Sequence, residues 1–284
     1  MKTKGKALVK QLCICCKEEG KSSNKEHVFP QWILKKTNTF SNPIKGTAGT
    51  KKIPGKHSVI PICIECNTAL GNILENPVSR ILENIEAGKG FSDYEAELLI
   101  RWMWKITGMF YWLERAKDKG DYGFINIKER CLKNIEMPRD RISLAVSLIE
   151  NEWVEKFNQS PMGIDVIPEN SNVLAAGVFN KIALIVYYTE FEKLVPELFT
   201  KYKLSNIPSM LNPNNRIYPK TGFKKGNEAV GKTTLISNGL LLKVHENEAL
   251  KQMINAIKAT KENDESLPEE FKTYINERIK NSND

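Results

Sequence analysis

Two short cysteine motifs decide the fold of this chain: Cys13-Ile-Cys-Cys16 near the N-terminus, and Cys63-Ile-Glu-Cys66, which runs directly into Asn67. Two thiolates spaced three residues apart can grip one metal ion from a tight turn, and two such turns complete a tetrahedron. Because 46 residues separate Cys16 from Cys63, the ion would clamp the two ends of an inserted substructure. Four thiolates leave no coordination position open, which predicts a structural Zn²⁺ rather than a catalytic one.

The two remaining cysteines fall outside this set. Cys15 is a neighbour within the first motif, and we expect its side chain to point elsewhere, while Cys131 is distant in the sequence. A chain of 284 residues in a reducing compartment does not need disulfides, so paired motifs favour a metal. A redox role for Cys13 and Cys16 is disfavoured, because redox motifs normally stand alone before a helix.

Length and composition predict a two-domain globular protein. The 284 residues include 41% hydrophobic and 27% charged side chains. The longest apolar runs fall well short of the ~20 residues that cross a bilayer, and the basic start is not a signal peptide. We therefore expect a cytoplasmic protein without membrane association, with a module over residues 1–90 and a second domain over residues 91–284.

The positive charge lies almost entirely in the N-terminal part. Residues 1–60 contain thirteen lysines against three acidic residues, a net charge of +10, so the other 224 residues carry −2 of the total +8. Such a segment suits a polyanion partner, or is simply a lysine-rich solvated surface. The lysines that lie among small polar residues in its second half are Lys35, Lys36, Lys45, Lys51, Lys52 and Lys56.

The N-terminal module is expected to mix short strands with a helix. Residues 26–30 indicate a strand that stops at Pro30, and residues 31–35 indicate one or two helical turns. Residues 36–56 are polar and glycine-rich, which predicts a long loop or ragged hairpin. Asn67–Asn76 predicts a helix that Pro77 interrupts or ends.

The C-terminal region is expected to be α+β, with sensing, partner binding and oligomerisation as open roles. Ser92 and Glu95 form a capping-box signature for a helix over residues 93–116 with an aromatic-rich buried face. The other elements expected are strands at 141–149, 173–179 and 182–188, with a turn at 180–181, and helices near 190–203, 246–260 and 267–281.

The motifs together resemble a known family. Cys-x-x-Cys, then Glu26-His27-Val-x-Pro30, then Cys-x-x-Cys-Asn67 at a helix start is similar to the HNH endonucleases, which have a ββα-metal fold. The run from Asn67 to Glu75 resembles bacterial HNH proteins that carry an appended C-terminal region. The resemblance is clear over residues 13–77 and weaker to about residue 115.

The resemblance implies a site and a reaction. The strand histidine of the family is the general base that activates water, and His27 matches it. Glu26 and Asn67 match the oxygen ligands of a divalent ion, Mg²⁺ or Mn²⁺, which stabilises charge on the phosphate. Because Cys66 precedes Asn67, the zinc would hold this second metal centre in register.

Some positions depart from the family pattern. The family often has aspartate where this chain has Glu26, and a second histidine where it has Asn67. The middle asparagine has no clear counterpart; His57 and Ser58 lie nearest to it and are read as loop or bracing residues. Glu75, about two turns beyond Asn67, is read as a helix-surface acid that could also assist the metal.

The sequence thus predicts a metal-dependent HNH endonuclease that hydrolyses phosphodiester bonds, most readily in DNA, with RNA left open. Contacts from loop lysines to the phosphate backbone imply weak sequence preference. By association, the resemblance places the protein in phage defence or restriction, with a homo-oligomer or protein partner formed through the C-terminal domain. The alternative is a non-catalytic zinc module that docks on nucleic acid or protein.

Overall fold

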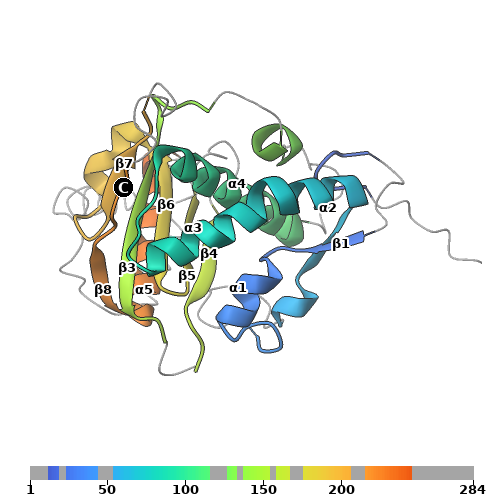
Figure 1. Ribbon diagram of the computed structural model, residues 1–284, viewed down its shortest axis with the longest axis horizontal. Helices are drawn as coiled ribbons and strands as arrows, with labels where there is room; N and C mark the ends of the chain where they lie inside the picture. Colours follow the sequence, from blue (N-terminus) through green and yellow to red (C-terminus); the bar gives the residue numbers. More distant parts are fainter. Residues whose placement is uncertain are drawn as a thin grey trace, which may run out of the picture.

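The computed structural model describes residues 12–18, 24–43, 54–115, 127–132, 137–153, 158–166, 175–205 and 215–244, in which two sheets are joined by helices (Figure 1). The smaller sheet is an antiparallel pair of β1 (Asn24–His27) and β2 (Val59–Ile62). The strands of the larger, six-stranded sheet are β3 (Ile142–Asn151), β4 (Met162–Val166), β5 (Ala175–Phe179), β6 (Ile182–Tyr188), β7 (Thr200–Lys203) and β8 (Thr221–Lys225).

Helices make up much of the rest of the described chain, and the expected mixed α+β class is confirmed. None of them combines the length and apolar character that crossing a bilayer requires. The helical elements are α1 (Gln31–Lys36), the 3₁₀ turn η1 (Gly55–His57), α2 (Ile64–Leu70), the π-helical turn η2 (Gly71–Glu75), α3 (Asn76–Glu86), α4 (Asp93–Arg115), the π-helical turn η3 (Lys128–Leu132), the 3₁₀ helix η4 (Thr189–Leu194) and α5 (Gly226–Val244). The helices expected near 246–260 and 267–281 lie outside the described residues.

The larger sheet has the order β4-β5-β6-β3-β7, and β8 lies along the second half of β3. Every pairing is antiparallel except that of β8 with β3. The expected strands at 141–149 and 182–188 are confirmed as β3 and β6. The predicted hairpin between β5 and β6 is also confirmed. Its turn places Asn180 at a positive φ of 56°, a conformation that asparagine tolerates.

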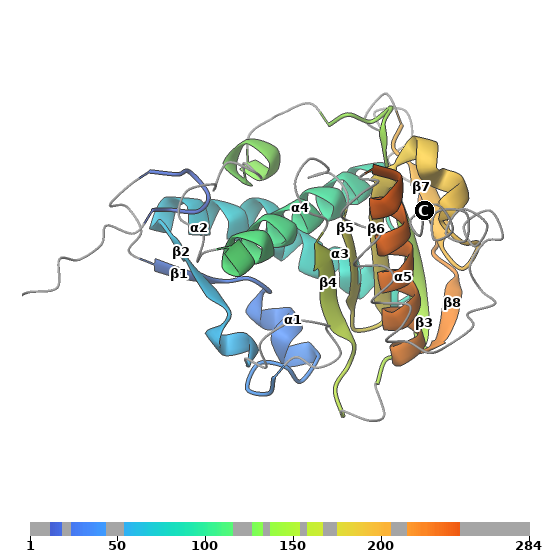
Figure 2. The same ribbon diagram turned by 180° about the vertical axis from the view of Figure 1, so that it is seen from behind.

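Both faces of this sheet are covered. Leu144 of β3 and Leu184 of β6 belong to a hydrophobic cluster shared with α3 and α4, whereas their neighbours Ala145 and Ile185 belong to a second cluster shared with α5. The alternation follows from the two-residue period of a strand. Figures 1 and 2 show the resulting layers, with α3 and α4 on one side of the sheet and α5 on the other.

The prediction of a single helix near residues 190–203 is wrong. The segment forms η4 and then β7, with Pro196 between them. Proline disfavours helical backbone in the residue before it, and β7 gains backbone pairing with Ser143–Val146 of β3. Three further elements, β4, β8 and α5, were not predicted; of these, β8 depends on pairing with β3, far away in the sequence.

The helix predicted over Asn67–Asn76 is longer at both ends. It begins at Ile64, and α2, η2 and α3 follow one another without a break, so Pro77 does not end it (Figure 1). Proline lacks the N–H that would bond back to Ile73, and the π-helical turn lies immediately before it, where the hydrogen-bond register changes.

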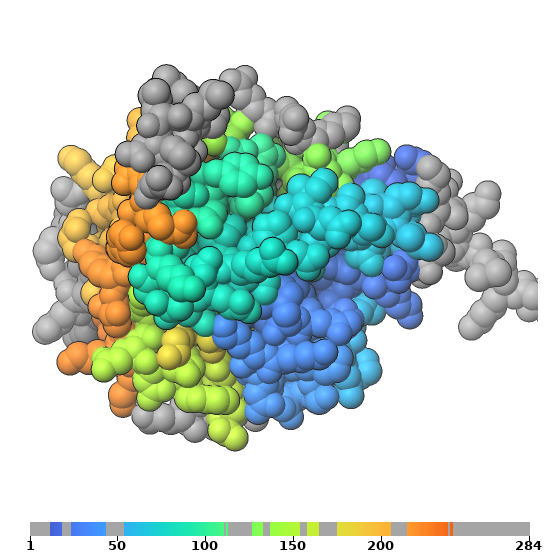
Figure 3. All heavy atoms as spheres, viewed as in Figure 1, coloured from blue at the N-terminus to red at the C-terminus, as the bar shows by residue number. Residues whose placement is uncertain are grey.

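Packing is continuous across the expected domain boundary near residue 90. Trp102 of α4 stacks on Trp32 of α1 with ring centroids 6.1 Å apart, and meets the edge of Phe179 of β5 at 4.9 Å. The N–H of Ser160 donates to the carbonyl of Thr37 at 3.3 Å. Figure 3 shows the N-terminal atoms lying directly against those around β4. The division into residues 1–90 and 91–284 stays a prediction.

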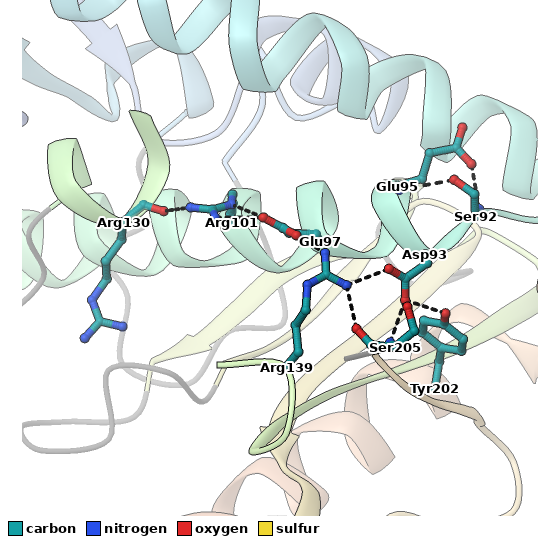
Figure 4. Close-up of polar contacts among 9 residues, drawn as sticks. All are labelled: Ser92, Asp93, Glu95, Glu97, Arg101, Arg130, Arg139, Tyr202 and Ser205. Atoms are coloured by element: carbon teal, nitrogen blue, oxygen red, sulfur yellow. Dashed lines mark hydrogen bonds and ion pairs between the residues drawn. The ribbon is translucent and has the colours of Figure 1, made fainter. Parts of the chain in front are cut away.

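The start of α4 is fixed by its own capping box. The N–H of Ser92 donates to the Glu95 carboxylate at 2.7 Å, and the N–H of Glu95 donates to the Ser92 hydroxyl at 3.3 Å, as predicted (Figure 4). Two of the backbone donors that a helix start leaves without partners are thereby satisfied.

A buried polar network then ties α4 to the sheet. Asp93 accepts hydrogen bonds from the Tyr202 hydroxyl at 2.6 Å, the Ser205 N–H at 2.8 Å and the Arg139 guanidinium at 2.6 Å (Figure 4). Arg139 also pairs with Glu97, one turn further along α4. Burial alone would raise the pKa of Asp93, but the three donors outweigh burial and lower it below its usual range.

We predict that Asp93→Asn lowers the free energy of unfolding by about 2 kcal/mol at pH 7, because hydrogen bonds to a charged acceptor are lost. A carboxyl with a lowered pKa in the folded state contributes stability above its unfolded pKa, and that contribution disappears as the pH falls through the folded pKa. The difference between wild type and variant should therefore shrink below about pH 4. Urea unfolding across pH measures it. Asp140→Asn, at an exposed turn residue, is the control; an equal loss there would contradict the role of the network.

Candidate functional site

The four predicted metal ligands come together in the fold. The sulfur atoms of Cys13, Cys16, Cys63 and Cys66 all lie within 4.8 Å of one another. The first two belong to a tight turn after residue 12, and the other two flank the start of α2. In the described chain this is the only group of three or more His, Cys, Asp or Glu side chains able to hold an ion. The cluster can bind one zinc ion with four thiolates.

Backbone N–H groups point at the sulfurs of this cluster. The N–H of Cys63 donates to Cys13 Sγ at 3.3 Å, and the N–H of Cys66 donates to Cys63 Sγ at 3.4 Å. Burial raises the pKa of Cys63 and Cys66. Burial would also raise the pKa of Cys13, but the hydrogen bonds that its sulfur accepts from backbone N–H groups outweigh burial and lower that pKa. Donors aimed at sulfur favour the thiolate, which is the form that binds metal.

The other two cysteines lie outside the cluster. Cys15 and Cys131 are both buried, and burial raises the pKa of each thiol to about 12. Both thiols are therefore neutral. The Cys15 thiol is in hydrogen-bond contact with Cys66 of the cluster, and the Cys131 thiol donates to the Arg101 carbonyl at 3.3 Å.

Beside the cysteine cluster, the chain forms an antiparallel hairpin followed at once by a helix. β2 ends at Ile62 and α2 begins at Ile64, while the N–H of Ile14 donates to the carbonyl of Pro61 at 3.1 Å. The cluster therefore joins the first cysteine turn to the junction of hairpin and helix. His27 is the last residue of β1 and pairs with Val59 of β2.

His27 occupies a half-buried position at the end of this hairpin. Its ring centroid lies 6.1 Å from that of Phe40, and its ring N–H donates to the backbone carbonyl of Lys56. Burial lowers the pKa of His27, the Glu26 carboxylate and the Lys56 bond raise it, and Lys105 lowers it; burial prevails. The imidazole is thus neutral near pH 7, with one ring nitrogen oriented by the backbone.

Glu26 is held by a residue that the sequence analysis did not select. Lys105 Nζ lies 2.9 Å from Glu26 Oε1 and also pairs with the Glu75 carboxylate. The Lys105 side chain is 0% exposed, and each carboxylate side chain is 14% exposed. Glu75 is therefore not the helix-surface acid that the sequence suggested. Burial lowers the pKa of Lys105, and Glu26 opposes that shift.

A signal for Lys105 was present in the sequence. It lies three residues after Trp102 and four before Met109, on the buried face predicted for this helix. A lysine at such a position needs a buried partner, because an unpaired ammonium inside a protein is costly.

For the other residues that the sequence selected, the structure gives their burial and their place in the fold. Asn67 is half-buried in α2, and its N–H donates to the Cys63 carbonyl at 3.0 Å. His57 is exposed in η1, directly after Lys56. Glu26 and His27 are consecutive residues of β1, and the Glu26 carboxylate is one of the charges that act on the His27 imidazole. Among the loop lysines, Lys45, Lys51 and Lys52 lie outside the described residues.

A second motif in the chain does not form the structure that its pattern suggests. The run from Gly226 through Gly231 and Lys232 to Thr233 matches the G-x-x-x-x-G-K-T spacing of a phosphate-binding loop. Here α5 begins at Gly226, so the whole run is helical; Lys232 pairs with Glu228 at 2.9 Å, and Thr233 is buried. Without a loop there is no cradle of free N–H groups for phosphate.

Comparisons of the chain with protein-family models, curated proteins and solved structures found no match.

We predict about one zinc ion per chain in the purified protein. Cys66→Ser should lose the zinc and unfold at a lower temperature, because metal binding contributes to folding stability. Elemental analysis and thermal melting measure both effects. Cys131→Ser, at a buried cysteine outside the cluster, is the matched control and should keep its zinc. Full zinc content in the Cys66 variant would contradict the assignment.

Proposed function

We propose that this protein is a metal-dependent endonuclease of the HNH type, which hydrolyses phosphodiester bonds in DNA with His27 as general base. The observation that carries the proposal is the combination of a hairpin followed by a helix, a four-cysteine cluster at their junction, and a half-buried histidine at the end of the first strand. This arrangement corresponds to the motif order from which the resemblance was drawn.

The surroundings of His27 suit a general base. A base must be neutral at working pH and must present a free ring nitrogen to the water that it deprotonates. Burial keeps the imidazole neutral by lowering its pKa, and the hydrogen bond to the Lys56 backbone uses one ring nitrogen, which leaves the other for water. The water proton passes to His27 as the water oxygen bonds to phosphorus and the bond to the leaving sugar oxygen breaks.

Positive side chains near His27 suit a phosphate backbone. Lys35 Nζ lies 5.8 Å from the centroid of the same Phe40 ring that neighbours His27, and Lys56 follows in η1 with an exposed side chain. Lysines of this kind bind phosphate without reading base sequence. They extend the basic character of residues 1–60, which carry a net charge of +10.

The residues that we propose to hold a divalent ion are Glu26 and Asn67. Carboxylate and amide oxygens suit Mg²⁺ and Mn²⁺; Glu26 lies in β1, and Asn67 lies in α2 directly after Cys66 of the cluster. When bound, such an ion would stabilise the negative charge that develops on the phosphate and leaving oxygens. The chain's own contribution is to orient Glu26 through Lys105 and Asn67 through the cysteine beside it.

We predict that the zinc-loaded protein cleaves plasmid DNA with Mg²⁺ or Mn²⁺, and that His27→Ala loses ~100-fold or more in rate, as expected for removal of a general base. Gel assays of nicking and linearisation measure this. His57→Ala is the matched substitution, and its exposed side chain predicts a much smaller loss.

Undiminished cleavage by the His27 variant would remove that residue from the mechanism. If the folded, zinc-loaded wild type cleaves neither DNA nor RNA, the non-catalytic zinc module becomes the better account. Measurement of DNA binding by the same preparation would then test that account directly.

A further inference from the structure

The pair of ion contacts around Lys105 joins two parts of the chain that the sequence separates. Lys105 lies in α4, beyond the expected end of the N-terminal module at residue 90, whereas Glu26 belongs to β1. Glu75 lies in the π-helical turn η2, between α2 and α3. One ammonium therefore gathers carboxylates from the hairpin and from the helix that follows it.

The geometry leaves part of Glu26 available. Lys105 contacts Oε1 of Glu26, and Oε2 has no partner within the described part of the chain. The Glu26 side chain keeps 14% exposure, while the ammonium has none. Because the ammonium is fully enclosed by protein, it cannot swing away as a surface lysine would, and the carboxylate that it holds is restricted to one orientation.

The net charge of Glu26, Glu75 and Lys105 together affects how the group attracts a cation. Two carboxylates and one ammonium sum to −1, so the group stays attractive to a divalent cation even though Glu26 is already paired. With Glu75 absent, the ammonium would neutralise Glu26 completely. Glu75 thus offsets the lysine, and the lysine orients Glu26.

We propose that Lys105 is a positioning residue of the nuclease site, which holds Glu26 in the orientation that binds the divalent ion, with Glu75 as its counter-charge. This inference rests on the proposed function. It makes α4 part of the site: the hairpin and α2 alone would lack the group that fixes one of the two oxygen ligands. Groups that orient a ligand typically change metal affinity when they are replaced.

The test compares Lys105→Met, Lys105→Arg and Glu75→Gln with wild type in the full-length, zinc-loaded protein. Two quantities are measured: Mn²⁺ binding by electron paramagnetic resonance without DNA, and the Mn²⁺ concentration that gives half-maximal plasmid cleavage. Lys105→Met makes the group more negative but frees the Glu26 carboxylate. Because we propose that the lysine acts by positioning, we expect the lost orientation to outweigh the added charge, which weakens Mn²⁺ binding and raises the half-saturating concentration by ~10-fold or more. Lys105→Arg keeps the charge and should recover part of the loss, while Glu75→Gln should shift both quantities in the same direction as Lys105→Met.

The control is Lys232→Met, which removes a lysine from another ion pair, with Glu228 of α5, at 2.9 Å. A purely structural role predicts that Lys105→Met lowers the melting temperature while Mn²⁺ binding by the folded protein stays unchanged, and that result overturns the inference. If Lys105→Met does not fold, Glu75→Gln decides in the same way. Cleavage by wild type with an unchanged Mn²⁺ response in the variants rejects this inference alone, whereas no cleavage by wild type rejects the proposed function with it.

Discussion

Four sulfur atoms held within 4.8 Å of one another are the constraint on which the N-terminal part of the molecule depends. The hairpin beside them has strands of only four residues each, and a two-stranded sheet of that size is marginal in water. Thiolates brought this close repel one another unless a cation joins them. A zinc ion would turn that repulsion into a cross-link between the cysteine turn and the start of α2, and would fix the residues next to it.

The parts of the fold that could be predicted are those whose signal is local. The Cys-x-x-Cys pairs need only their own spacing, the capping box of Ser92 and Glu95 needs four residues, and the apolar run from Ile182 to Tyr188 reads directly as a buried strand. The segment that became β7 carries a pattern compatible with a helix. Its actual conformation depends on pairing with β3, about 55 residues earlier in the chain, which no local pattern reveals.

The candidate site divides in the same way. His27 and Glu26 could be selected because they are adjacent within a recognisable motif, and the cysteines because they repeat a spacing. Lys105 could not be assigned a role from sequence, since its partners lie 79 and 30 residues away. Its position on the apolar face of α4 was visible, but the meaning of a charged residue there depends on which carboxylates the fold brings to it. The phosphate-loop pattern that begins at Gly226 is the opposite case: its residue spacing is correct, but the backbone is helical and forms no phosphate-binding loop.

The order of elements along the chain has a consequence for how the molecule is made. The four cysteines of the cluster precede every strand of the larger sheet, so during synthesis the cluster can assemble before that sheet exists. Lys105 emerges next. The strand β8, in which Thr221 pairs with Leu148 of β3, completes the sheet last. Contacts so distant in sequence form slowly, and chains fold from their N-terminal end as they emerge. A nascent chain could therefore bind its metal early, whereas the larger sheet is complete only once β8 has emerged.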